Sequence, residues 1–154
     1  MNILNRFIGI LFSLARVVFG ILWMKSGIDK LSGGFGVEGL VPVVLYNTDS
    51  PQWYKQLFDS IVGPYASWFD IIIPWGEVLI GVGLLVGLFI IPALIVAVFL
   101  HVNYLLADMI YTYPTDVMCS VILLTGKRFT SYISLDRWIL RYPFNIKKVV
   151  HLRK

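Results

Sequence analysis

Charged residues are scarce in this sequence. Only 14% of its 154 residues are Asp, Glu, Lys or Arg, whereas 58% are hydrophobic, and the mean hydropathy is +0.78. Soluble domains contain about 25% charged residues, so this deficit excludes an ordinary water-soluble fold. We therefore predict an all-α polytopic membrane protein with a single domain, residues 1–154, in which helices pack against one another in lipid.

Cysteine is almost absent as well. Cys119 is the only one in the sequence, which excludes an intramolecular disulfide and a redox or metal-binding cysteine pair. We expect it to be a buried, unreactive thiol. The sequence also lacks a nucleotide-binding glycine loop, a Ser/His/Asp arrangement and a zinc-ligand spacing. We predict no bound metal or haem.

Four apolar runs have lengths that suit membrane spans. We place the spans at residues 7–28, 69–89, 92–109 and 112–125, and the last one is short. Pro92 marks a tight turn between the second and third spans, because proline is tolerated in the first turn of a helix. These runs predict a four-helix transmembrane bundle.

A long outer loop, residues 29–68, joins the first two spans. Within it we predict a short amphipathic helix at residues 51–62, with Ser50 as its N-cap and Pro51 at its first position. The apolar side chains at helical spacing are Trp53, Leu57, Phe58 and Ile61. We expect this helix to lie on the outer membrane surface or to cap the bundle.

Basic residues concentrate at the C-terminal end. Residues 126–154 contain one acid, Asp136, and the bases Lys127, Arg128, Arg137, Arg141, Lys147, Lys148, Arg153 and Lys154. Because such residues gather on the cytoplasmic side of membrane spans, we predict a basic cytoplasmic tail at 126–154, both termini in the cytoplasm, and a multi-pass protein of the cell (inner) membrane. Nucleic-acid binding is the weaker explanation, and contact with anionic lipids would follow from this topology.

The basic tail also predicts a second short helix at the inner membrane surface. Ser134 is expected to cap it. Its apolar side would comprise Leu135, Trp138, Ile139 and Tyr142.

The second span contains an acid, Glu77. An acid within a span costs roughly 2.5–3.5 kcal/mol on insertion scales, so it normally has a partner or a function. Arg16 lies in the first span, and His101 and Asn103 lie in the third. Counting 1.5 Å per residue puts Glu77 about 10–12 Å from the outer end of its span and Arg16 about 13 Å from the inner end of its own. We therefore predict an Arg16–Glu77 pair and a polar pocket in the outer half of the bundle.

Other interpretations of these residues remain open. The pair would serve only to fix helix packing in one of them, with Gly76, Gly83 and Gly87 forming a close helix contact. Asp108 and Asp116 are expected to be outer-edge charges. The aromatic residues near the span ends would anchor the protein at the interface or line a site for a planar ligand; they are Trp23, Trp68, Trp75, Tyr104, Tyr111 and Tyr113.

Several segments together resemble the DoxX/DoxD family. They are Arg16–Gly20 followed by Gly27–Leu31, the Trp75-Gly76-Glu77 segment through Leu88, Asn103–Ala107, Leu135–Arg137 and the outer-loop segment Ser50–Lys55. The resemblance extends over most of residues 8–140, and the Gly-Glu of the second span is its sharpest mark. It implies a four-helix membrane bundle, and its DoxD side implies a subunit of thiosulfate:quinone oxidoreductase that would need another subunit for thiosulfate activity.

The resemblance and the buried polar residues lead to one leading hypothesis. Quinone would be the cofactor, with Glu77, Arg16 and His101 as catalytic residues and Asn103, Trp75 and Lys30 as binding residues. The alternative is a non-catalytic accessory or scaffold subunit of a larger respiratory or other membrane complex. Partners would be membrane lipids, other membrane or extracytoplasmic subunits, or further copies of the chain. A small transporter fits less well because no internal repeat is evident.

Overall fold

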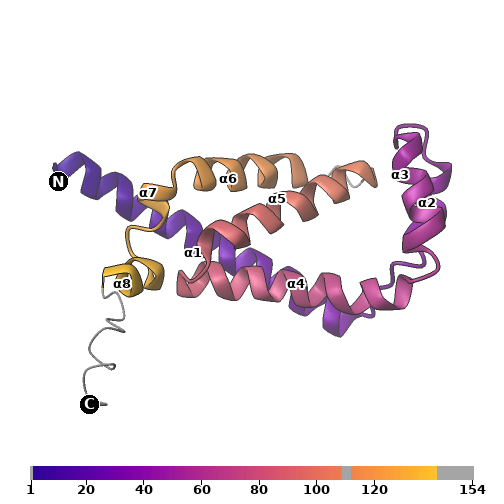
Figure 1. Ribbon diagram of the computed structural model, residues 1–154, viewed down its shortest axis with the longest axis horizontal. Helices are drawn as coiled ribbons and strands as arrows, with labels where there is room; N and C mark the ends of the chain where they lie inside the picture. Colours follow the sequence, from indigo (N-terminus) through magenta and orange to yellow (C-terminus); the bar gives the residue numbers. More distant parts are fainter. Residues whose placement is uncertain (1, 109–111, 142–154) are drawn as a thin grey trace, which may run out of the picture.

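The computed structural model describes residues 2–108 and 112–141, and every regular element in this part of the chain is a helix. Four helices run along the length of the molecule in alternating directions (Figure 1): α1 (Ile3–Gly33), α4 (Ala66–Val86), α5 (Ile90–Leu106) and α6 (Tyr113–Thr125). Helix α1 packs on α4, and α5 packs on both α4 and α6. The prediction of an all-α fold is confirmed.

Two of these helices, α1 and α4, are long and apolar enough to cross a membrane. Helices α5, with 17 residues, and α6, with 13, are apolar but shorter. At 1.5 Å per residue, α5 extends over about 25 Å, a little less than a bilayer core of about 30 Å. Large apolar side chains are exposed along the helices, as a lipid-facing surface requires; on α1 they include Leu11, Leu14, Val18, Ile21 and Leu22.

Glycines bring α1 and α4 close together, but they are not the ones we expected. A Cβ atom at Gly27 would lie 2.7 Å from the Pro74 carbonyl oxygen, and one at Gly81 would lie 2.6 Å from the backbone nitrogen of Met24. By contrast, a Cβ at Gly76 would meet no atom within 4 Å. The predicted stripe of Gly76, Gly83 and Gly87 therefore does not form one contact: Gly83 lies against Leu88 and Ala93, and only Gly87 meets α1, at the head group of Arg16.

Gly87 instead ends α4. Its φ of 74° is the left-handed conformation that glycine adopts readily at a helix C-terminus. The turn to α5 therefore falls at residues 87–89, before the position at Ile90–Pro92 that we predicted, and Pro92 lies in the first turn of α5. The Asp136 carboxylate accepts hydrogen bonds from the backbone N–H groups of Phe89 and Ile90. This side chain satisfies two of the amides that a helix N-terminus leaves without intrahelical partners.

The connection between α1 and α4 forms a compact cap at one end of the molecule. It contains α2 (Leu40–Tyr46), α3 (Gln52–Leu57) and a π-helical turn, η1 (Phe58–Val62). The buried stripe of α3 and η1 is Tyr54, Phe58 and Val62. Trp53 and Ile61, which we expected on the apolar side, are exposed.

The cap is fastened to the end of α5. Ser50 is not the N-cap we predicted: its hydroxyl donates to the carbonyl oxygen of Leu106. Tyr54 donates its hydroxyl to the carbonyl oxygen of Asn103, and burial raises the pKa of Tyr54 to about 12. The Ser50 hydroxyl supplies a donor to the Leu106 carbonyl at the end of α5. Tyr54 adds a second donor to the Asn103 carbonyl, which also accepts the backbone N–H of Ala107.

The opposite end of the molecule holds the N-terminus of α1 together with α7 (Lys127–Thr130) and α8 (Leu135–Arg141) (Figure 1). Ser134 accepts a hydrogen bond from the Arg137 backbone N–H, which is the cap we expected for this helix. Tyr142 and residues 143–154 of the predicted tail lie outside the described residues, as do Met109 and Tyr111. Cys119 is exposed, so our expectation of a buried thiol is wrong.

Candidate functional site

Glu77 lies at the centre of a hydrogen-bonded cluster between α1, α4 and α5. Its side chain is 1% exposed. Lys30 contacts one carboxylate oxygen at 2.5 Å, and the Tyr104 hydroxyl donates to the same oxygen at 2.6 Å. Ser26 donates to the other oxygen at 3.1 Å. The buried acid is thus balanced by a cation and two hydroxyl donors, as a charge in a membrane helix requires.

The predicted Arg16–Glu77 pair is wrong. Arg16 lies beside Gly87, ten residues further along α4 than Glu77, which corresponds to about 15 Å of helix. Its Nη2 donates to the carbonyl oxygen of Ile133 at 2.9 Å. The predicted pair rested on the distance of each residue from the end of its apolar run, and these ends do not give the register of one helix against the other. In the structure, the antiparallel packing of α1 and α4 sets Glu77 against the last third of α1, where Ser26 and Lys30 lie. Arg16 therefore does not belong to the polar site around Glu77.

His101 on α5 forms the second part of the site. Its ring stacks on Trp23 of α1 with centroids 4.4 Å apart, and its side chain is largely buried. The Nε2 atom lies 4.0 Å from a carboxylate oxygen of Asp116. The Nδ1 atom is buried and has no hydrogen-bond partner among the described residues. Asp116 therefore faces His101, rather than being the simple outer-edge charge that we expected.

A cavity of about 320 Å³ joins these two parts. Side chains from α1, α4, α5 and α6, together with Thr112 just before α6, line it: Phe19, Leu22, Trp23, Ser26, Glu77, His101, Tyr104, Thr112, Tyr113 and Asp116. The wall combines aromatic rings with titratable groups. Such a combination suits a planar molecule that also makes hydrogen bonds.

The structure separates the six candidate residues. Glu77 and His101 line the cavity, and Lys30 reaches it through its contact with Glu77. Asn103 turns away, because its side-chain amide donates to the Phe99 carbonyl oxygen of its own helix. Trp75 is 53% exposed on the outside of α4. These two residues, like Arg16, do not contact the cavity.

Sequence reasoning missed Ser26 and misjudged Asp116. Ser26 precedes Lys30 by four residues, so the two lie on one face of α1, and Lys30 also donates to the Ser26 hydroxyl at 3.3 Å. That spacing was a usable signal. No local pattern marks Asp116 as a partner of His101, because their contact depends on how α6 packs on α5. The described residues hold no group of three or more His, Cys, Asp or Glu side chains that could bind a metal ion.

Comparison with known proteins gives a family match. The DoxX family model matches residues 11–112, which include Lys30, Glu77, His101 and Tyr104 but end before Tyr113 and Asp116. A search of the curated proteins and a search of the solved structures found no match.

Proposed function

The chain belongs to the DoxX family of membrane proteins, and we propose that it binds a quinone head group in the cavity between Glu77 and His101 and exchanges protons with it. The observation that carries the proposal is the unpartnered buried Nδ1 of His101, beside an aromatic wall and a buried carboxylate. A buried imidazole nitrogen without a partner is costly. A carbonyl or hydroxyl oxygen of a bound ring would supply the missing partner.

The residues of the cavity fit such a ring in shape and in chemistry. Trp23, Tyr104 and Tyr113 offer aromatic faces and edges for stacking. The cavity volume of about 320 Å³ lies within the range of ligand sites, which starts at about 300 Å³. Asn103, Trp75 and Arg16 are not part of this proposal, because none of them lines the cavity.

Proton exchange is the role we assign to the titratable residues. A quinone takes up two electrons and two protons on reduction to a quinol, and the electrons would come from a separate redox partner. The Tyr104 hydroxyl donates to Glu77, so a proton can pass along this hydrogen bond at the cavity wall. His101 holds the second exchangeable position, with Asp116 orienting its Nε2 side. In a DoxD-type system, thiosulfate bound by another subunit would be the electron donor.

The proposed setting is a multi-pass protein of the inner membrane, with α1, α4, α5 and α6 as four spans. The arrangement of charge supports both termini in the cytoplasm. Arg6 and the bases of α7 and α8 lie at the end of the molecule opposite α2 and α3 (Figure 1), and basic residues favour the cytoplasmic side. The cavity then opens toward the outer half of the membrane.

The test measures quinone binding directly. The purified protein is titrated with a short-chain ubiquinone analogue while tryptophan fluorescence is followed, and quinone carried over from native membranes is extracted and quantified. We expect saturable quenching in the native protein and about tenfold weaker binding in His101→Gln, the effect of losing one buried hydrogen bond of about 1.4 kcal/mol. Trp75→Leu removes an exposed tryptophan outside the cavity and should leave the affinity unchanged. Absence of bound quinone and of quenching, or equal affinity in His101→Gln, would refute the proposal.

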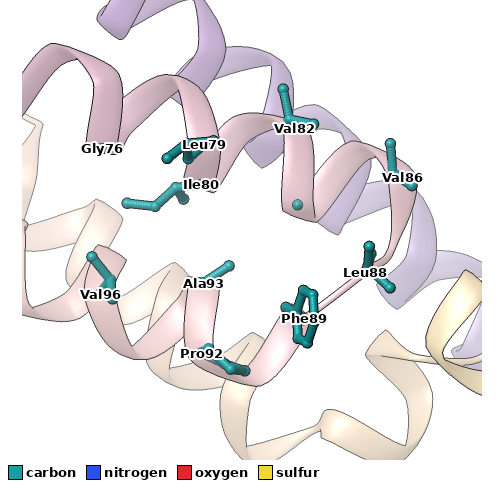
Figure 2. Close-up of a pocket in the computed structure, with 11 residues that line it drawn as sticks. Gly76, Leu79, Ile80, Val82, Val86, Leu88, Phe89, Pro92, Ala93 and Val96 are labelled. Carbon is teal, nitrogen blue, oxygen red and sulfur yellow. The ribbon is translucent and has the colours of Figure 1, made fainter.

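A second candidate function is that of an accessory subunit without chemistry of its own. An open apolar groove of about 470 Å³ between α4 and α5 favours it. Figure 2 shows its lining of aliphatic and aromatic side chains, among them Leu79, Val86, Phe89 and Val96. A membrane helix of a partner subunit would fill this groove. Glu77→Gln separates the two functions: lost quinone chemistry with intact assembly supports the first, whereas lost assembly supports the second.

A further inference from the structure

A second buried polar group lies at the other end of the α1–α4 pair. Arg16 is 3% exposed, and only its Nη2 has a partner, the Ile133 carbonyl oxygen. The Nε and Nη1 atoms are both buried and have no hydrogen-bond partner among the described residues. Leaving buried guanidinium N–H groups unpaired is costly. Within residues 2–108 and 112–141, the site therefore lacks an acceptor that carries negative charge.

The acids of the chain do not supply this acceptor. All nine Asp and Glu residues lie in the described part of the sequence, and the ion pairs found there join Lys30 to Glu77 and His101 to Asp116. Asp136 attracts Arg16 electrostatically. However, its two carboxylate oxygens accept the backbone N–H groups at the start of α5. Residues 142–154 contain no Asp or Glu.

An open hollow of about 570 Å³ adjoins the guanidinium. Its lining includes Arg16, Val86, Ile133 and Ser134, so one buried cation faces a largely apolar space. The lack of a side chain at Gly87 makes room for the arginine head, because a Cβ there would collide with Nη1. The hollow lies beside α8, at the end of the molecule that also holds the N-terminus of α1 (Figure 1).

We propose that Arg16 binds one phosphate-type oxyanion in this hollow, either the phosphodiester of a lipid head group or a free phosphate ion. Phosphate oxygens form short, charge-assisted hydrogen bonds with guanidinium groups and would satisfy both unpaired nitrogens. The site is about 15 Å of helix away from Glu77 and does not depend on quinone binding. Anionic head groups are available at the cytoplasmic leaflet, where basic residues gather.

The first arm of the test supplies a lipid. Native mass spectrometry of the full-length protein in detergent is performed with added phosphatidylglycerol. We expect one retained lipid in the native protein and binding weakened about tenfold or more in Arg16→Gln, since a hydrogen bond to a charged group is lost. Arg6→Gln is the matched control, because Arg6 is an exposed arginine on the same helix and its loss removes the same charge.

The second arm supplies inorganic phosphate to lipid-free protein. A rise in Tm over chloride at equal ionic strength, present in the native protein and lost in Arg16→Gln, identifies a free anion as the ligand. Binding of phosphatidylglycerol alone identifies the lipid. If Arg16→Gln does not fold, Val86→Trp tests the same site, because Val86 is 44% exposed and a bulky side chain there would fill the hollow. Unchanged binding of both ligands in these variants, or an equal loss in Arg6→Gln, would overturn the proposal.

Discussion

Replacing Lys30 by Met would leave the Glu77 carboxylate buried without its cation. The Lys30 Nζ atom lies 2.5 Å from Oε1 of Glu77, and the Glu77 side chain is 1% exposed. Breaking a buried ion pair from one side costs about 3–5 kcal/mol. The Lys30 side chain is 18% exposed and two hydroxyl donors remain on the carboxylate, so we expect the lower end of that range, about 3 kcal/mol.

The double variant Lys30→Met/Glu77→Gln tests whether this cost comes from the unpaired charge. The glutamine amide can still accept the Tyr104 hydroxyl, and no charge is left in the site. We expect Glu77→Gln alone and the double variant each to cost about 1–1.5 kcal/mol, which is the loss of a typical hydrogen bond. The coupling energy of the cycle would then be about 3 kcal/mol.

Reversible unfolding by SDS in mixed micelles, followed by tryptophan fluorescence, provides the four free energies of unfolding. Lys25→Met serves as the control, since Lys25 is an exposed lysine on the same helix and its loss should change stability by no more than about 0.5 kcal/mol. Additive effects of the two single substitutions within about 0.5 kcal/mol would refute the argument. The ion pair would then contribute nothing specific to the fold.

Three further outcomes follow from local geometry. Gly81→Ala should cost about 1–3 kcal/mol of unfolding free energy, because its methyl group would overlap Met24, whereas Gly76→Ala has open space and should be neutral in the same SDS titration. Stability should fall more steeply between about pH 10 and pH 12 in the native protein than in Tyr54→Phe, because the pKa of the buried Tyr54 is raised to about 12 and its hydroxyl therefore ionises at pH 10 only in the unfolded chain; unfolding of both proteins at pH 9 and pH 11.5 measures this difference. Asp136→Asn should cost about 1 kcal/mol through weaker capping of α5, and a Tm equal to that of the native protein would contradict it.

The need of Glu77 for a partner was predictable from the sequence, but the identity of the partner was not. An acid in an apolar run requires compensation on physical grounds alone. Choosing between Arg16 and Lys30 requires the register of α1 against α4, which the close contacts of Gly27 and Gly81 determine. A shift of a few residues along a helix moves a side chain by several ångströms. Counting depth from the ends of apolar runs does not reach that accuracy.

Hydrophobicity does not distinguish the inner from the outer face of a membrane helix, because lipid and protein interior are both apolar. Trp23 and Trp75 are both tryptophans within apolar helices, and hydrophobicity alone does not tell them apart. Trp23 is buried at the cavity, whereas Trp75 is exposed. Small and polar residues carry the missing information: the buried residues of α1 are Gly9, Ser13, Arg16, Phe19, Gly20, Trp23 and Gly27. Apart from the aromatics, these are glycine, serine and arginine at spacings of three, four or seven residues, which keep them on one face of the helix. Applied to α1, this pattern places Trp23 on the same buried face as Gly20 and Gly27, and so identifies it as a tryptophan that faces the interior of the molecule.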